Sequence, residues 1–527
     1  MSGWNFATTW ETVAREVPDR EAIVCGRRRL TFGELDRRAD RLAHVLAAHG
    51  IGAGDAVAIS LTNRPEYVEA FFAALKLGAA PVNLNYQYVP DELAHVLGDC
   101  AAAAVVFHVE AHEPVAAAVD AVGGTRPPLL LAVDGDYEAA LAAAPDGPAP
   151  RPRPPSGDDR LFLYTGGTTG RPKGVVWRVE DYYLQGWEAA RPGTEPPDPA
   201  AAMRAGKRAA TLLPASPLVH ATALGMATAT LSGGGTIVLR DDRKLDPAAL
   251  WHLVAGEHVA VMSIVGETFA RPLVEALERA DDVRALDLSS LRAIVSSGMA
   301  FSAVSKQALL DRLPGLTIVD TLGASEAMIT RSTVTRDGPS VPTTFAAKDN
   351  VRVLTDDGRD VAPGSGEDGV LAVAGRLPLG YHHDPDATAR MFREVDGVRY
   401  ATPGDRARVL ADGSIELLGR GSACINTGGE KVYPEEVEEV VKRYPDVLDA
   451  AVVGVPDEKW GEAITAIVQP REGAEIDSTE LIKHVKANLA AYKAPKSVIV
   501  VDSLGRSPAG KLDYPGLREK AIAEVGA

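Results

Sequence analysis

Leu161–Gly174 reads LFLYTGGTTGRPKG, an apolar run followed by a loop rich in glycine and threonine. Glycines allow a backbone to turn sharply and to bring its N–H groups close to an anion. Thr165, Thr168 and Thr169 add hydroxyl groups, and Lys173 adds a positive charge. These features favour a loop that binds the phosphates of a nucleotide, and a flexible connection between two strands is the alternative.

Two common phosphate-binding patterns do not fit this loop. No glycine in it is followed, after four residues, by Gly-Lys-Ser or Gly-Lys-Thr, and the spacing Gly-x-Gly-x-x-Gly is also missing. The sequence therefore indicates neither a P-loop NTPase nor a dinucleotide-binding Rossmann site.

The loop resembles the phosphate-binding signature of the adenylate-forming superfamily, which includes acyl-CoA synthetases, adenylation domains of peptide synthetases and firefly luciferase. Later motifs match in the same order, so the resemblance covers nearly all 527 residues. It implies ATP, Mg²⁺ and coenzyme A as cofactors and substrates. It also implies two steps, in which a carboxylate and ATP form an acyl-adenylate and a thiol then displaces AMP. The loop residues expected to bind phosphate are Thr165, Gly166, Gly167, Thr168, Thr169 and Lys173.

Composition bounds the class of protein. A chain of 527 residues is too long for one ordinary core, which predicts two or more domains. Hydrophobic residues make up 46% and charged residues 24%, as in globular proteins. The net charge of −17 argues against nucleic acid or an anionic membrane as the main partner. No apolar run approaches the ~20 residues needed to span a bilayer.

The cysteines and the N-terminal residues bear on localisation. The three cysteines are widely spaced, without a disulfide framework or a metal-ligand pattern, and the first residues lack a signal-peptide pattern. We therefore expect a cytoplasmic protein. The expected partners are a small carboxylic acid, ATP and coenzyme A, and a homodimer is one possible assembly.

Hydrophobic periodicity predicts an α/β fold. Alternating helices and buried strands imply parallel sheets covered by helices, and the short strands beyond residue 340 imply a small antiparallel barrel. The expected strands include 56–60, 102–107, 129–133, 236–239, 259–265, 292–296, 317–320 and 351–354. The expected domains are an N-terminal region at 1–420, made of αβ lobes at about 1–190 and 191–340 with a β-barrel at 341–419, and a mobile α+β domain at 421–527.

The segment 320–326 resembles the adenine- and magnesium-binding motif of the superfamily. By this resemblance Asp320, Thr321, Leu322 and Gly323 contact the nucleotide, and the carboxylate of Glu326 holds Mg²⁺, a hard cation that prefers oxygen ligands. A glutamate that caps a helix after a strand is the alternative for Glu326. The family usually has an aromatic residue at the position of Leu322, where stacking on a base contributes ~1–3 kcal/mol.

Other matches complete the expected nucleotide and acyl sites. Asp405 and Arg420 match positions that hold ribose and phosphate, and Gly298 and Met299 match the adenine edge. His220 matches a histidine at the mouth of the acyl pocket, where it would act by gating and positioning; a satisfied core histidine is the alternative. The expected acyl-pocket residues are His220, Val265, Gly266, Gly298 and Gly323.

The C-terminal motifs imply domain motion and thiol access. The hinge position holds Ser422 in place of the usual aspartate or lysine. Gly428, Gly429, Glu430 and Lys431 match the loop along which coenzyme A enters. Cys424 is expected to be a packed structural residue. Lys511 matches the lysine that stabilises charge during adenylation.

The residues of the hinge motif resemble those of actinobacterial acyl-CoA synthetases that activate steroid side-chain acids. This resemblance implies that the substrate is a bulky or polycyclic acid. Three alternatives remain at this stage. The enzyme could load a carrier protein in place of coenzyme A, or it could catalyse only one half-reaction. It could also be a non-catalytic binding protein that retains the pocket.

Overall fold

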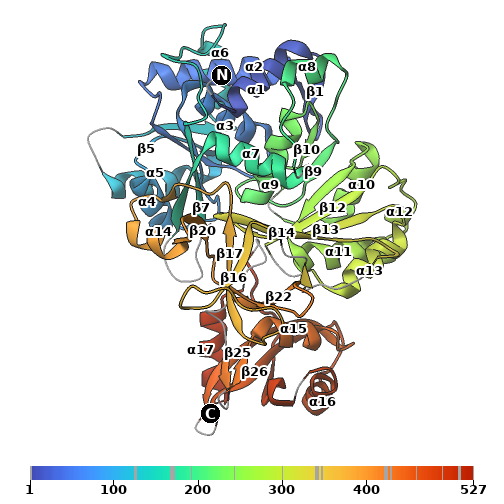
Figure 1. Ribbon diagram of the computed structural model, residues 1–527. Helices are drawn as coiled ribbons and strands as arrows, with labels where there is room; N and C mark the ends of the chain where they lie inside the picture. The colour runs from blue at the N-terminus through green and yellow to red at the C-terminus, as the bar shows by residue number, and fades with distance from the viewer. Residues whose placement is uncertain are drawn as a thin grey trace.

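The computed structural model shows three stacked regions, with the C-terminal part at the end opposite the N-terminus (Figure 1). It describes residues 3–123, 127–165, 172–191, 193–242, 244–298, 301–338, 344–345, 348–420, 425–427, 430–457, 460–489, 491–507 and 512–525.

The first sheet carries the hairpin on either side of the glycine-rich loop. Its seven strands follow the order β18-β8-β7-β4-β3-β5-β6, and the five from β7 to β6 are parallel. The strands are β3 (Ala56–Ser60), β4 (Ala80–Asn83), β5 (Ala102–His108), β6 (Leu129–Val133), β7 (Arg160–Thr165), β8 (Lys173–Arg178) and β18 (Gly380–Tyr381). Helix α3 (Pro65–Leu77), next to β3 and β4, is buried along its whole length. Strands buried on both faces read as continuous apolar runs, which explains why β3 and β6 were predicted with their observed bounds.

The second sheet has eight strands in the order β14-β13-β12-β11-β9-β10-β1-β2. They are β1 (Glu21–Cys25), β2 (Arg28–Thr31), β9 (Leu212–Pro214), β10 (Ile237–Leu239), β11 (Val261–Ile264), β12 (Ala293–Ser297), β13 (Thr317–Ala324) and β14 (Ala327–Val334). Strand β1 pairs in parallel with β10. Sheet membership therefore crosses the predicted boundary between the two αβ lobes, and β18, from the stretch predicted as the β-barrel, joins the first sheet.

An antiparallel sheet follows, as the short strands and turns predicted. Its path is β15-β22-β21-β17-β20-β19, with β16 paired to β17. The strands are β15 (Thr344–Phe345), β16 (Val351–Leu354), β17 (Asp368–Ala374), β19 (Phe392–Val395), β20 (Val398–Ala401), β21 (Asp405–Val409) and β22 (Ile415–Arg420). Its closure into a barrel stays a prediction.

The C-terminal part is a compact α+β unit. Its sheet runs β24-β23-β26-β25, with β27 parallel to β26. The elements are β23 (Ile425–Thr427), β24 (Glu430–Val432), α15 (Pro434–Lys442), β25 (Val447–Asp457), β26 (Gly461–Pro470), α16 (Ser478–Asn488), β27 (Ser497–Val500) and α17 (Tyr514–Val525). The Tyr433 hydroxyl donates to Asp368 Oδ2 on β17 at 2.9 Å, which links this unit to the antiparallel sheet.

The predicted fold class, a large N-terminal α/β region followed by a smaller α+β domain, is confirmed. The domain boundaries and the mobility of the C-terminal domain stay predictions, and the hinge residue Ser422 lies outside the described residues. Within the part of the chain that the structure describes, no helix combines the length and apolar character required to cross a bilayer.

Candidate active site

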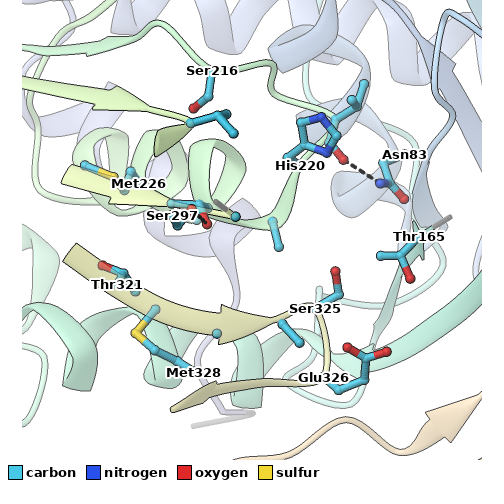
Figure 2. Close-up of a pocket in the computed structure, with 18 of the residues that line it drawn as sticks. Asn83, Thr165, Ser216, His220, Met226, Ser297, Thr321, Ser325, Glu326 and Met328 are labelled. Carbon is cyan, nitrogen blue, oxygen red and sulfur yellow. Dashed lines mark hydrogen bonds between the residues drawn. The ribbon is translucent and has the colours of Figure 1, made fainter. Parts of the chain in front are cut away.

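A cavity of about 1390 Å³ lies between the ends of the first two sheets. Figure 2 shows Thr165 on one side of it, Thr321 and Met328 of the β13–β14 hairpin on the other, and His220 between them at one end. Residues of the C-terminal unit, Gly505, Ser507, Leu512 and Asp513, also line it. The cavity thus gathers residues that are distant in the sequence.

The glycine-rich loop connects two adjacent strands at the cavity wall. Strands β7 and β8 are antiparallel, and Thr165 is the register partner of Lys173 at their ends. Both side chains line the cavity. The sequence therefore places a hydroxyl group and an ammonium group on either side of the loop that was predicted to bind phosphate.

Glu326 lies in the tight turn between β13 and β14. Ala324 and Ala327 are register partners on either side of this turn, so the prediction of a strand before the motif is confirmed and the alternative of a helix cap at Glu326 is wrong. The Glu326 side chain lines the cavity and its residue is only 8% exposed. Its Oε1 accepts a hydrogen bond of 2.5 Å from the Tyr381 hydroxyl of β18.

A second contact holds the same turn in place. The Trp177 indole N–H, on β8, donates to the Ser325 carbonyl oxygen at 3.0 Å. Trp177 is almost fully buried. The turn is therefore fixed against the hairpin that carries the glycine-rich loop, and Figure 2 shows Ser325 and Glu326 on the Thr165 side of the cavity.

The Lys173 ammonium has a partner in this structure. It forms an ion pair with Asp384 Oδ2 at 2.8 Å and lies 5.7 Å from the centre of the Tyr381 ring. Its hydrogen bond lowers the pKa of the Asp384 carboxyl group. Because both side chains are partly exposed, water screens this pair, and we expect an anionic phosphate to compete for Lys173.

Asn83 joins the glycine-rich hairpin to the His220 segment. Its Nδ2 donates to the carbonyl oxygen of Val219 at 2.5 Å, drawn in Figure 2, and its Oδ1 accepts from the Tyr164 N–H at 2.5 Å. His220 precedes helix α9 (Ala221–Ser232) and lines the cavity. The amide of one buried residue therefore fixes the distance between Thr165 and His220.

Three of the predicted acyl-pocket glycines and valines meet at the cavity. Val265, Gly298 and Gly323 line it, whereas Gly266 is not among the lining residues. A Cβ atom on Gly323 would lie 3.1 Å from the Ala327 carbonyl oxygen, so a glycine permits the close turn of the hairpin. The wall between them is polar at one point, where the Ser297 hydroxyl donates to Thr222 Oγ1 at 2.7 Å.

Alternation along β13 separates the remaining motif residues into two faces. Thr321 and Gly323 line the cavity. The carboxylate of Asp320 accepts a hydrogen bond of 2.6 Å from Lys306, and burial raises the pKa of that carboxyl group. Leu322 packs against the apolar core of the antiparallel sheet. Nucleotide contacts by Asp320 and Leu322 stay predictions, and these two side chains are not among those that line the cavity.

Asp405 begins β21 and is 8% exposed. It is the register partner of Arg420 on β22, and the preceding residues Thr402 and Pro403 line the cavity. The structure therefore brings the two predicted ribose-binding positions together next to the cavity, although their role stays a prediction.

Family models match most of the chain. The model of the AMP-binding enzyme family matches residues 10–382, and the model of the AMP-binding enzyme C-terminal domain matches residues 436–511. The chain belongs to the AMP-binding enzyme family. The resemblance to adenylate-forming enzymes is thus confirmed.

Named relatives of this AMP-binding enzyme are CoA ligases. It is 39% identical over 526 residues to a medium/long-chain-fatty-acid–CoA/3-oxocholest-4-en-26-oate–CoA ligase of Mycolicibacterium smegmatis, covering 97% of this chain and 95% of the relative. It is 37% identical to a 3-oxocholest-4-en-26-oate–CoA ligase of Rhodococcus rhodochrous, covering 97% and 94%. A feruloyl-CoA synthase of an Amycolatopsis species is 36% identical, covering 95% of each chain.

Solved structures share the fold over the whole chain. An anthranilate CoA ligase in complex with anthranoyl-AMP superposes with a TM-score of 0.85 at 22% identity, covering 100% of this chain and 99% of the other. The ATP-bound MatB of Rhodopseudomonas palustris superposes with a TM-score of 0.82 at 27% identity, covering 98% and 99%.

Some predicted residues of the AMP-binding enzyme cannot be placed. The positions outside the described residues are Gly166, Gly167, Thr168, Thr169, Met299, Ser422, Cys424, Gly428, Gly429 and Lys511. Arg420, Glu430 and Lys431 lie on described strands, but their side chains are outside the description.

Several cavity residues and their supports were not predicted from the sequence. Tyr381, Asn83 and Arg331 stand outside the recognised motifs, and each contacts or lines the site through long-range folding. Only Asn83 carried a usable signal, because it ends an apolar strand at the edge where parallel strands place ligands.

Proposed function

We propose that this protein is an ATP-dependent acyl-CoA ligase. One observation carries the proposal: a buried carboxylate, Glu326, lies with Thr165 and Lys173 at one end of a cavity whose wall also contains apolar side chains such as Val261, Val265 and Val295. The polar end suits a nucleoside triphosphate, and the apolar side chains suit the hydrocarbon part of an acid. Membership of the AMP-binding enzyme family and the names of the relatives support the same activity.

The chemistry requires activation because a carboxylate resists attack by a nucleophile. In the first step a carboxylate oxygen attacks the α-phosphorus of ATP, the bond to the β-phosphate oxygen breaks, and pyrophosphate leaves. In the second step the thiolate of coenzyme A attacks the acyl carbon, and AMP leaves. Holding the reactants in line supplies much of the rate.

The described residues fit this demand. Thr165 would donate to phosphate oxygens, and Lys173 would exchange Asp384 for phosphate. Glu326 would hold Mg²⁺, which neutralises phosphate charge when bound and commonly uses only one or two protein carboxylates. The described residues contain no group of three or more side chains of the metal-ligating types, which fits a metal that binds mainly through the nucleotide.

The C-terminal unit would complete the adenylation site. Ser507 and Leu512, on either side of the segment that contains Lys511, both line the cavity. We propose that Lys511 approaches the α-phosphate and the acyl carboxylate, and that Asp405 and Arg420 bind the ribose. We also propose that the loop around Gly428 and Gly429 admits coenzyme A after a rotation near Ser422.

The acid is proposed to be bulky. The cavity of about 1390 Å³ exceeds the ~300–1,000 Å³ of ordinary small-molecule sites. It must hold a nucleotide and an acid together, and small side chains such as Ala210, Ala229 and Ala293 line it. Relatives named for fatty acids and for a steroid acid support a long or polycyclic hydrocarbon part.

Localisation and assembly are further proposals. Burial raises the pKa of the Cys25 and Cys100 thiols, and free thiols of this kind suit a reducing cytoplasm. Light scattering on the purified protein decides between a monomer and the proposed homodimer.

A coupled assay of AMP release tests the function. Short, fatty, aromatic and polycyclic acids are each supplied with ATP, Mg²⁺ and coenzyme A, and we expect release that depends on both acid and thiol. A carrier protein offered in place of coenzyme A tests the alternative acceptor. If none of the acids leads to release of AMP, the non-catalytic alternative is supported. Thioester formed from supplied acyl-adenylate, without acid-dependent pyrophosphate exchange, would indicate that the enzyme catalyses only the thioesterification half-reaction.

A further inference from the structure

Arg331, a cationic side chain in the wall of the cavity, has no counter-ion among the described residues. Arg331 on β14 lines the cavity, and its Nε atom is buried without a hydrogen-bond partner. Among the described residues, no carboxylate forms an ion pair with it. By contrast, the nearby cation Lys306 is already paired with Asp320 at 2.6 Å.

A second unsatisfied donor lies directly opposite. Thr321 on β13 is the register partner of Arg331 on β14, so the two side chains leave the hairpin on the same face. The Thr321 hydroxyl is also buried without a hydrogen-bond partner, and its residue is 7% exposed. Figure 2 shows Thr321 on the hairpin strand that leads away from Glu326.

Leaving these donors unpaired is costly. A buried polar group without a partner destabilises the fold, and a buried charged group does so more strongly. Burial lowers the pKa of the Arg331 guanidinium, which reflects the same cost. A ligand oxygen at this point would satisfy both groups, since a guanidinium presents several donors in a plane.

The position of the pair sets where that oxygen lies. Gly323 pairs with Met328 at the Glu326 end of the hairpin, and Thr321 pairs with Arg331 two residues farther along β13. Two residues of a strand advance about 7 Å. The carboxyl group of the acid is proposed to react at the Glu326 end, so an oxygen bound by the pair would be separated from it by a stretch of the acyl chain.

The surroundings of the pair are apolar or already satisfied. Val295 and Val261 line the same wall, and Ser297, the register partner of Thr321 on β12, donates to Thr222. An acid made only of hydrocarbon would leave Arg331 desolvated and unpaired. The wall would therefore favour acids that carry an oxygen acceptor on the chain over acids made only of hydrocarbon.

We propose that Arg331 and Thr321 form a specificity site for a second oxygen acceptor, a carboxylate or a carbonyl group, carried on the acyl chain of the acid. This inference rests on the proposed acyl-CoA ligase function and adds the class of its substrate. A carboxylate is favoured, because it would also supply the counter-ion that Arg331 lacks.

Matched acids and variants test the site. The acids are dicarboxylic, oxo and plain hydrocarbon acids of equal chain length, in a series from short to long. The variants are Arg331→Met, which keeps the side-chain volume, Arg331→Lys, which keeps the charge, and Thr321→Val. Thr333→Val, at an exposed position on the same strand, controls for disturbance of β14.

For wild type we expect the highest kcat/KM with an oxygenated acid of intermediate length. Arg331→Met should lower kcat/KM for that acid by roughly 10- to 100-fold and leave the hydrocarbon acid unchanged or improved. Arg331→Lys should retain part of the preference, Thr321→Val should lose a smaller part, and Thr333→Val should lose none. Calorimetric binding of the same acids in the presence of a non-hydrolysable ATP analogue should rank them in the same order.

Equal loss for both classes of acid in Arg331→Met, or no loss for either, would overturn the inference. If Arg331→Met does not fold, the same comparison with Arg331→Lys and Thr321→Val decides. Wild-type turnover of hydrocarbon acids without any preference for oxygenated acids would refute this site but leave the ligase function intact. If no acid is turned over, the ligase function fails, and the calorimetric comparison alone decides whether the acceptor site exists.

Discussion

Tyr381 and Glu326 are 55 residues apart in the chain, and a hydrogen bond of 2.5 Å joins the phenol of one to the carboxylate of the other. Tyr381 is on β18, an edge strand of the first sheet and the last of its strands in the chain. Glu326 is in the hairpin turn of the second sheet. The bond therefore spans the two sheets at the place where the nucleotide is proposed to bind. The hydrogen bond orients the carboxylate through Oε1, and Oε2 is the oxygen that we propose holds Mg²⁺.

This relationship predicts unequal effects of two substitutions. Glu326→Gln removes the charge that would hold Mg²⁺, so we expect acid-dependent pyrophosphate exchange to fall by about 100-fold or more. Tyr381→Phe keeps the charge and removes only the orienting hydrogen bond, which predicts a loss of about tenfold or less. Exchange rates over a magnesium titration measure both, and an equal loss in the two variants would contradict a metal role for Glu326.

The ion pair between Lys173 and Asp384 predicts an effect on ATP affinity. Asp384→Asn removes the competing charge but keeps the oxygen that accepts from the Ala387 N–H at the start of helix α14 (Pro385–Met391). We expect the KM for ATP to stay equal or to fall, because Lys173 becomes available to phosphate. Lys173→Met should raise that KM by about tenfold, a loss typical of one charge-assisted contact. A rise in the KM for ATP in Asp384→Asn together with a fall in Lys173→Met would exclude phosphate binding by Lys173.

Lys511 is predicted to act in one half-reaction only. Lys511→Ala should abolish adenylation, because the charge that develops at the α-phosphate is no longer stabilised. Thiol transfer from supplied acyl-adenylate should be largely spared, since the thiolate in that step attacks the acyl carbon and not the α-phosphorus. Separate assays of the two half-reactions give the answer, and parallel losses would assign Lys511 a structural role.

The two described cysteines predict slow thiol chemistry. Burial, with neighbouring acids, raises the pKa of Cys25 to about 11 and that of Cys100 to about 12. A raised pKa keeps each group as a thiol at pH 8, and the thiolate is the reactive form. We expect little alkylation of either residue at pH 8 in the folded protein, with faster labelling as the pH rises towards these values. Peptide mapping after timed alkylation measures this, and rapid labelling at pH 8 would disagree with the buried positions.

Apolar runs predicted the parallel strands β3, β5, β6 and β12 to within one residue at each end, because such strands are buried on both faces, although β1, β4 and β9 were not predicted. Strand β14 was missed for the opposite reason: its sequence AMITRSTV mixes polar and apolar residues, since it is the edge of its sheet and one face lines the cavity. The same strand carries Arg331. An edge strand next to a site lacks a continuous apolar run, so hydrophobic periodicity did not predict the strand that forms the polar wall of the cavity.

The motif residues were predicted by resemblance, and their partners were not. Glu326 and Lys173 stood out in the sequence, but Tyr381, Asp384 and Asn83 become partners only through contacts between elements far apart in the chain. Their residue types are ordinary in loops and strand ends. Sequence reasoning therefore found the charged groups that line the cavity and missed the groups that hold them in place.

The central claim is that the cavity joins a carboxylate to the α-phosphate of ATP. An acid labelled with a heavy oxygen isotope in its carboxyl group, turned over with ATP and coenzyme A, tests this directly by mass spectrometry of the products. The account predicts one labelled oxygen in AMP and none in pyrophosphate. Label in pyrophosphate or inorganic phosphate, or AMP formed without label, would contradict it.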